Sequence, residues 1–160
     1  KLLLTEWEQR QANLPYASPY EALIMASIVE KETGQSQDRA QIASVFINRL
    51  KKGMRLETDP TVIYGIRDFD GNLTRKHLET FTPYNTYVIK GLPPGPIASP
   101  GKDALEAALF PAQTGYFFFV SKNNGTHHFS SSFEEHQHAV QRYQIRREGA
   151  RPPENRSKTP

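Results

Sequence analysis

Cysteine is absent from the 160 residues of this chain, which excludes thiol catalysis and thiolate-ligated metal sites. Long hydrophobic runs are absent as well, because no stretch approaches the roughly 20 apolar residues that a helix needs to cross a bilayer. No charged segment followed by an apolar one opens the chain, as it would in a signal peptide. We therefore expect the sequence as printed to fold as a soluble protein.

Charge of one sign is also scarce, because 20 Lys and Arg residues stand against 17 Asp and Glu residues, a formal net charge of +3. Much of this excess lies near the C-terminus, at Arg146, Arg147, Arg151, Arg156 and Lys158. The remainder lacks the basic stripe with interleaved aromatic residues that nucleic-acid binding requires. We predict no nucleic-acid partner, and the basic tail leaves an anionic polymer as an alternative partner.

What the chain does have is the length and composition of one globular domain. Hydrophobic residues make up 37% of it, and 12 prolines with 10 glycines indicate that much of it is ordered loop. We predict a single folded domain over residues 1–147 and a disordered basic tail over 148–160, which has little to bury. The chain begins at Lys1 within a helical pattern, so we expect further sequence upstream.

Two helices are predicted in the first third of the chain. Residues 18–21 (Ser-Pro-Tyr-Glu) form a capping box with proline at the first helical position, and apolar residues follow on nearly every side through Val29. This pattern is typical of a helix packed inside the core, with Gly34 as its C-cap. A second, amphipathic helix is expected from about residue 38 to 51, ending at Gly53.

The rest of the chain predicts short elements joined by turns. Residues 54–100 are rich in turn signals, and a third helix opens at 99–103 and ends at about residue 109. An antiparallel hairpin follows, with strands at 116–120 and 126–130. A second capping box, at 132–135, begins a last helix that runs to about the end of the domain. Its inward side chains are predicted to be Phe133, His136, Val140 and Tyr143. Helices packed on a small antiparallel sheet make the predicted fold class α+β.

Two carboxyl groups, those of Glu30 and Glu32, lie near the end of the predicted core helix. The negative end of the helix dipole and the apolar neighbours disfavour their charged forms, so a raised pKa is expected for either. A protonated carboxyl is what a general acid needs to protonate a glycosidic oxygen. Residues two apart on a helix point to opposite sides, so helical geometry leaves the choice between them open. A solvated helix end without catalytic function is the alternative.

Four histidines crowd one short stretch, at His127, His128, His136 and His138. Their spacing does not converge on a metal ion, because neighbours on a strand face opposite ways and the two helical histidines are not four residues apart. We predict no metal site and no cofactor. A single histidine of the hairpin that faces a cleft is the remaining functional interpretation.

A series of sequence blocks extends from about Pro19 to Tyr143. The blocks are MASIVEKET (25–33), IASVFINRL (42–50), MRLETDPTVIYG (54–65), YNTY (84–87), GLPPGPI (91–97), SPG (99–101) and HHF (127–129). Together and in this order they closely resemble the endolytic murein transglycosylase (YceG-like) family.

The resemblance implies cleavage within the glycan strands of bacterial peptidoglycan, between N-acetylmuramic acid and N-acetylglucosamine. The product end is a 1,6-anhydromuramoyl group, and no water is consumed. Glu30, the first acid of the Val-Glu-Lys-Glu motif, is implied as the single catalytic acid and base. Support for the transition state is expected from residues of the matching blocks, namely Asn48, Asp59, Tyr64, Asn85, Tyr87 and His127.

The resemblance also implies a cellular setting. Family members are usually anchored in the inner membrane by one N-terminal helix, with the catalytic part in the periplasm, and peptidoglycan synthases are expected as partners. A noncatalytic peptidoglycan-binding module is the alternative function, in which Tyr64, Tyr84 and Tyr87 stack on sugar rings.

Overall fold

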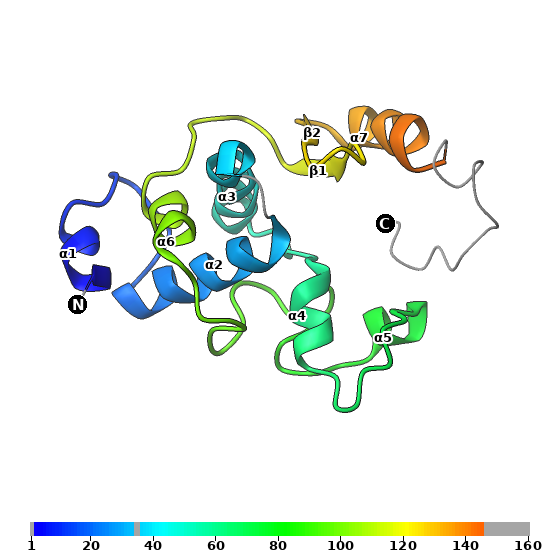
Figure 1. Cartoon of the computed structure of the whole chain (residues 1–160), viewed down its shortest axis with the longest axis horizontal. Coiled ribbons are helices and arrows are strands. Elements are labelled where there is room, and N and C mark those ends of the chain that lie inside the picture. The colour runs from blue at the N-terminus through cyan, green and yellow to red at the C-terminus, as the bar shows by residue number, and fades with distance from the viewer. Residues whose placement is uncertain (1, 34–35, 146–160) are drawn as a thin grey trace.

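The computed structural model describes residues 2–33 and 36–145 (Figure 1). Its helices are α1 (Leu2–Glu8), α2 (Pro19–Glu32), α3 (Ser36–Lys52), α4 (Asp59–Tyr64), α5 (Arg75–Glu79), α6 (Lys102–Leu109) and α7 (Phe133–Val140), the last continued by a π-helical turn, η1 (Gln141–Ile145). Strands β1 (Phe118–Ser121) and β2 (His127–Ser130) pair antiparallel in a two-stranded sheet. The α+β prediction is confirmed.

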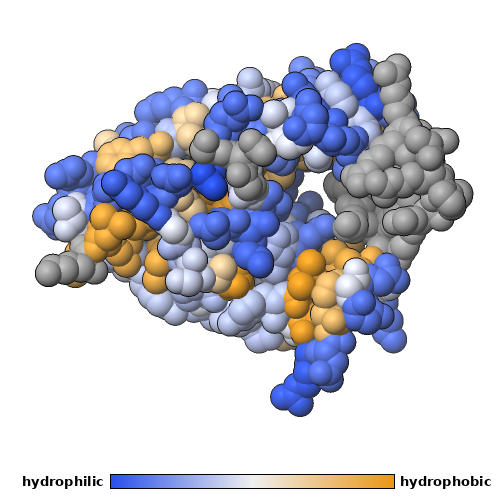
Figure 2. All heavy atoms as spheres, viewed as in Figure 1, coloured by the Kyte–Doolittle hydropathy of each residue, from blue (hydrophilic) through white to orange (hydrophobic). Residues whose placement is uncertain are grey.

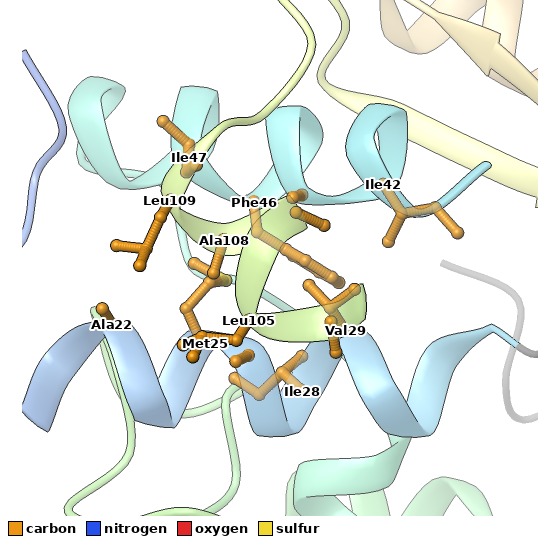
Figure 3. Packing of buried hydrophobic residues seen from close by; sticks show 14 of the residues in the cluster. Ala22, Met25, Ile28, Val29, Ile42, Phe46, Ile47, Leu105, Ala108 and Leu109 are labelled. Atoms are coloured by element: carbon orange, nitrogen blue, oxygen red, sulfur yellow. The ribbon is translucent and has the colours of Figure 1, made fainter. Parts of the chain in front are cut away.

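The core lies where α2, α3 and α6 meet. Figure 3 shows Met25 and Val29 of α2, Phe46 of α3 and Leu105 and Leu109 of α6 directed toward one another. All five side chains are at most 5% exposed. This enclosure explains why α2 is apolar on nearly every side, as the sequence predicted.

The ends of α2 and α3 follow their predicted signals. The side chain of Ser18 accepts a hydrogen bond from the backbone N–H of Glu21, and Pro19 lies in the first turn of α2. Gly53 ends α3 with a φ of +75°, a conformation that a residue with a Cβ rarely adopts. The predicted C-cap of α2, Gly34, lies outside the described residues.

The segment between α3 and α6 is mainly loop, with α4 and α5 as its short helices. Asn85 holds this loop together, because its buried amide donates hydrogen bonds to the carbonyl oxygens of His77 (3.3 Å), Leu78 (3.0 Å) and Thr80 (2.8 Å). Its Oδ1 accepts a hydrogen bond from the backbone N–H of Tyr87 at 2.8 Å. The loop is therefore fixed by side-chain bonds to its own backbone rather than by a sheet.

The hairpin and α7 form a second layer beside α3 (Figure 1). Phe119 of β1 meets Phe46 of α3 edge to face, with ring centroids 5.8 Å apart. In α7, His136 is buried as predicted, whereas Phe133 is 46% exposed, so its predicted inward position is wrong. Phe133 follows the N-cap Ser132 directly, and in the first turn its ring lies 5.8 Å from that of Phe118 and 6.4 Å from that of His136, between centroids.

The surface is largely hydrophilic in the view of Figure 2, with apolar patches near α1 and near α4 and α5. Exposed aromatic residues include Tyr64, at 52%, and Phe81, at 66%. Among the described helices, none has the length and apolar character of a membrane span. The predicted basic tail, 148–160, lies outside the described residues.

Candidate active site

A cavity of about 390 Å³ is lined by residues from the end of α2, the start of α4, α3, the hairpin and α7. This volume falls within the range of small-ligand pockets, roughly 300–1,000 Å³. The polar and aromatic residues of its lining include Glu32, Arg49, Asp59, Tyr87, Phe118, His127 and His136. Carboxyl groups, a guanidinium, a phenol and two imidazoles thus share a space large enough for a sugar unit.

Glu32 is the last residue of α2 and lines this cavity. Its Oε2 accepts a hydrogen bond from the hydroxyl of Thr58. Burial raises the pKa of Glu32 to about 7, the bond from Thr58 acts to lower it, and the negative charge of Asp59 acts to raise it. The raised pKa predicted for either carboxyl is therefore found at Glu32. A carboxyl with this pKa is protonated in much of the population at neutral pH, as a general acid must be.

Three threonine side chains hold the start of α4 beside Glu32. The backbone N–H of Thr58 donates to Oγ1 of Thr86 at 3.0 Å, and the hydroxyls of Thr61 and Thr86 lie 2.7 Å apart. All three residues are at most 1% exposed. This buried cluster fixes the backbone from which Asp59 enters the cavity.

Tyr87 and Asp59 form a hydrogen-bonded pair in the wall of the cavity. The hydroxyl of Tyr87 donates to Oδ1 of Asp59 at 2.7 Å. Burial and the neighbouring charge of Asp59 raise the pKa of the Tyr87 phenol above its ordinary value, so the phenol keeps its proton at neutral pH. The Asp59 carboxylate is thereby held in place in the wall of the cavity.

Arg49 joins α3 to the hairpin. Its Nε donates to the carbonyl oxygen of Phe117 at 2.7 Å, and its Nη1 donates to that of Arg55 at 2.9 Å. Nη1 also lies 3.6 Å from a carboxylate oxygen of Glu57, and the guanidinium carbon lies 4.9 Å from the centre of the Phe118 ring. The planar donor fork of arginine thus locks two segments that carry cavity residues.

His127 and His128 face opposite ways, as predicted for neighbours on a strand. Nδ1 of His127 lies 2.9 Å from Oδ2 of Asp38, and His127 lines the cavity. The ring of His128 packs near Tyr143, with centroids 5.9 Å apart. Of the two, His127 is the histidine that faces the candidate site.

His136 closes the α7 side of the cavity. Its ring stacks on Phe118, with centroids 5.0 Å apart. Burial, and then the positive charges of Arg49 and His128, lower the pKa of His136 to about 4. This imidazole is therefore neutral at pH 7 and contributes no charge to the cavity.

Glu30 points to another part of the structure. Its Oε1 accepts a hydrogen bond from the backbone N–H of Gly101 at 2.8 Å, and Gly101 is the N-cap of α6. The cavity lining contains Glu32 but not Glu30. Glu30 thus joins the end of α2 to the start of α6, and its catalytic role stays a prediction.

The other predicted binding residues divide into two groups. Asp59, Tyr87 and His127 line the cavity with Glu32. Asn48 and Asn85 do not belong to that lining, and the side-chain amides of both donate hydrogen bonds to backbone carbonyl oxygens. Nδ2 of Asn48 donates to the carbonyl oxygens of Thr114 and Tyr116, at 3.0 and 2.9 Å. These two side chains hold loops in place, and contact with a substrate stays a prediction for them.

Tyr64 lies at the far end of α4 from Asp59. It packs against the ring of Tyr84, with centroids 4.8 Å apart, and is not part of the cavity lining. Sequence reasoning weighed Glu32 but did not single out Thr58, Arg49 or Asp38. Thr58 directly precedes Asp59 in one sequence block, and this position could have indicated its role. Arg49 and Asp38 reach the site through contacts between segments that are distant in sequence.

Comparisons with known proteins agree with this architecture. The model of the YceG-like family matches residues 1–142. The endolytic murein transglycosylase of Bacillus subtilis strain 168 is 47% identical over 126 residues, which are 79% of this chain and 35% of the relative. The protein of the same description from Streptococcus pneumoniae strain D39 is 33% identical over 126 residues, 75% of this chain and 23% of the relative. The chain therefore spans about a quarter to a third of the curated relatives that it matches.

A solved structure also resembles this chain. The crystal structure of a yceG-like protein from Listeria monocytogenes superposes with a TM-score of 0.70 at 47% sequence identity. The match covers 76% of this chain and 39% of that one.

Proposed function

Because this chain belongs to the YceG-like family, we propose that it is the catalytic part of an endolytic murein transglycosylase. Its substrate is the glycan strand of peptidoglycan, cut between N-acetylmuramic acid and N-acetylglucosamine to leave a 1,6-anhydromuramoyl end. The observation that carries the proposal is the carboxyl of Glu32, which lines a cavity of sugar size with a pKa of about 7.

Glu32 is the acid and base that the geometry favours. It shares the cavity with Asp59, Tyr87 and His127, whereas the carboxyl of Glu30 is bonded to the start of α6. Glu30 remains the second candidate, because it is the acid that the family resemblance implied. The two assignments differ in one respect that experiment can resolve, namely which substitution removes activity.

In the first step the protonated Glu32 gives its proton to the glycosidic oxygen. The bond between that oxygen and C1 of the muramoyl sugar breaks, and its electron pair stays on the oxygen. C1 and the ring oxygen share the positive charge that develops. The carboxylate of Asp59, held by the hydroxyl of Tyr87, supplies negative charge and a fixed acceptor in the same cavity.

In the second step the carboxylate of Glu32 takes the proton of the muramoyl C6 hydroxyl as O6 bonds to C1. The anhydro ring closes, and Glu32 returns to its protonated form without water as a reactant. A pKa of about 7 suits a group that must first give and then accept a proton near neutral pH. Hydrolysis would need a second carboxylate as nucleophile or water activator.

Product chemistry tests this function. Polymeric peptidoglycan is digested with the purified chain, and the masses of the released fragments are measured by mass spectrometry. Anhydromuramoyl ends are expected, each lighter by one water than the hydrolysed end. Reducing ends instead would mean hydrolysis, which needs a second carboxylate. Asp59 would then be the first residue to substitute in search of it. Saturable binding of glycan strands without any product would indicate the noncatalytic module.

The cellular setting of the whole protein belongs to the same proposal. The family resemblance supports an inner-membrane anchor outside this segment, a periplasmic catalytic part and peptidoglycan synthases as partners. Fractionation of cells that carry the full-length protein tests the location. Recovery of the protein in the membrane fraction, with these residues open to protease only from the periplasmic side, is the expected result.

A further inference from the structure

Asp38 and His127 form a pair of ionisable side chains that the mechanism above does not use. Nδ1 of His127 and Oδ2 of Asp38 lie 2.9 Å apart. The side chain of His127 is 12% exposed and that of Asp38 is 8% exposed. The two residues are far apart in sequence and come from different elements, the first turn of α3 and the start of β2. Nothing in the local sequence pattern brings them together, so the contact is a product of the fold.

The hydrogen-bond chemistry of this pair determines which nitrogen of the imidazole carries the proton. An ionised carboxylate only accepts hydrogen bonds, so the contact requires the proton on Nδ1 of His127. In a neutral ring Nε2 then carries the lone pair and acts as an acceptor. A carboxylate that holds a histidine in one tautomer and orientation is an established means of preparing its second nitrogen for chemistry.

The ring of His127 is bordered by two aromatic rings and by the cavity. The ring of Phe119 meets His127 edge on, with centroids 5.6 Å apart, and that of Phe129 lies 6.3 Å away. These apolar neighbours offer no hydrogen bond, whereas the cavity that His127 lines also contains the carboxyl of Glu32. An acceptor nitrogen placed there suits a hydroxyl group of a sugar, which donates one hydrogen bond.

We propose that Asp38 is a positioning residue that holds His127 with Nδ1 protonated, so that Nε2 accepts a hydrogen bond from a hydroxyl of the glycan strand in the cavity. This inference rests on the proposed function for the identity of the ligand. It assigns His127 a defined task, which is to hold a sugar hydroxyl opposite Glu32. It also assigns a role to Asp38, which lies outside the cavity lining.

Nitrogen NMR of the histidine side chains tests the first half without any need for activity. The chain is labelled with ¹⁵N, and the protonated nitrogen of His127 is identified in the wild type and in Asp38→Asn. We expect the Nδ1–H form in the wild type. In the variant we expect a mixture or the Nε2–H form, because the amide can donate where the carboxylate only accepted. An Nε2–H ring in the wild type would overturn the proposal, as would an unchanged tautomer in Asp38→Asn.

Asp103→Asn is the matched control. Asp103 also lies in the first turn of a helix, α6, but its side chain is 68% exposed and pairs with Arg39 at 3.4 Å. The substitution removes the same charge near a helix N-terminus without touching the cavity. We expect it to leave the His127 tautomer and the rate of glycan cleavage unchanged.

The second half is tested with glycan strands. Uncrosslinked strands added to Glu32→Gln, which is expected to bind without cutting, should move the Nε2 signal of His127. Asp38→Asn should lower kcat about tenfold or more with a smaller change in KM, because a misplaced acceptor costs most in the transition state. Strands that bind while the His127 signals stay still, or full kcat in Asp38→Asn, would contradict the inference. Failure of the wild type to cut or bind strands would instead count against the proposed function.

Discussion

The carboxyl of Glu32 lies in surroundings that favour its neutral form. Burial is the main cause, and the charge of Asp59 acts in the same direction, while the hydroxyl of Thr58 opposes both by donating to the carboxylate. A group that gives and retakes a proton in each catalytic cycle requires such a balance of opposing influences on its pKa. A carboxyl with an ordinary pKa would be ionised at neutral pH and would have no proton to give. The three groups come from two neighbouring elements, α2 and the start of α4.

A first prediction concerns stability and pH. The pKa of Glu32 is about 7 in the folded chain, against an ordinary value of 4.5. Between these two pH values the folded chain therefore holds a proton that the unfolded chain has lost. Stability from this group is complete below the lower value and is lost as the pH rises through the higher one. Glu32→Gln removes the ionisation, so its Tm minus that of the wild type should increase from about pH 5 to about pH 8.

Thermal unfolding across this range checks that prediction. His136, with a folded pKa lowered to about 4, acts in the opposite direction, because its stability contribution falls as the pH drops below the ordinary histidine value. It is present in both proteins, so its effect largely cancels in the difference. A difference in Tm that stays flat or decreases with pH would contradict the assignment of a raised pKa to Glu32.

A second prediction concerns the groups that tune Glu32. Thr58→Val removes a hydrogen bond that lowers the pKa, so the alkaline limb of the activity profile should move to higher pH. Asp59→Asn removes a charge that raises it, so the limb should move to lower pH, together with a lower maximal rate. Rates of product release measured from about pH 5 to about pH 9 check both. Shifts in the same direction would rule out Glu32 as the group that titrates.

At the scale of elements, α2 was the best predicted part of the chain. Its N-cap Ser18, apolar surface and approximate end followed from local sequence, because helix starts and core burial leave local signals. The predicted capping box is only half formed, because the carboxylate of Glu21 accepts the backbone N–H of Ala17 instead of that of Ser18. The choice between Glu30 and Glu32 had no such signal. It depends on what lies beside the last turn, which is the start of α6 on one side and α4 with the hairpin on the other.

The positions of two predicted binding residues likewise depend on contacts that local sequence does not show. Asn48 and Asn85 have side chains suited to hold a sugar, but the same amides also satisfy backbone carbonyls in loops, and the structure uses them so. Phe133 was placed inward from its helical spacing, although the first turn of α7 extends beyond the core. Residue type and period therefore identified candidate groups, whereas contacts between distant segments decided where each one points.

A third prediction concerns the joint between α3 and the hairpin. Arg49→Met removes the donors to the carbonyl oxygens of Phe117 and Arg55, leaving two partly buried acceptors without their partner. The free energy of unfolding should fall by on the order of 3 kcal/mol. Urea unfolding measures this change, and Arg75→Met serves as the control. Arg75 forms an exposed pair with Glu79 at 3.9 Å, so its loss should cost about 0.5 kcal/mol or less.

Equal losses in the two variants would mean that Arg49 does not join the two layers. A loss confined to Arg49→Met should be accompanied by faster hydrogen exchange at the strand amides, such as that of Val120, than at those of α2.

At the scale of the whole molecule, the cavity is assembled from parts that are distant in sequence. A three-helix core fixes the end of α2, a loop held by its own side chains presents Asp59 and Tyr87, and the hairpin brings His127. The fold class and the order of elements were visible in the sequence, since they depend on patterns within each segment. The cavity was not, because it exists only where those segments meet.

A pair of conservative substitutions tests whether Glu32 is the acid and base of glycan cleavage. Glu32→Gln and Glu30→Gln remove one ionisable group each from the same helix, and the glutamine at 30 keeps an oxygen that can accept the N–H of Gly101. The rate at which anhydromuramoyl ends appear from polymeric peptidoglycan is measured for both. If Glu32 has this role, we expect a loss of at least about a hundredfold for Glu32→Gln and near wild-type rates for Glu30→Gln. A fully active Glu32→Gln beside an inactive Glu30→Gln would contradict it.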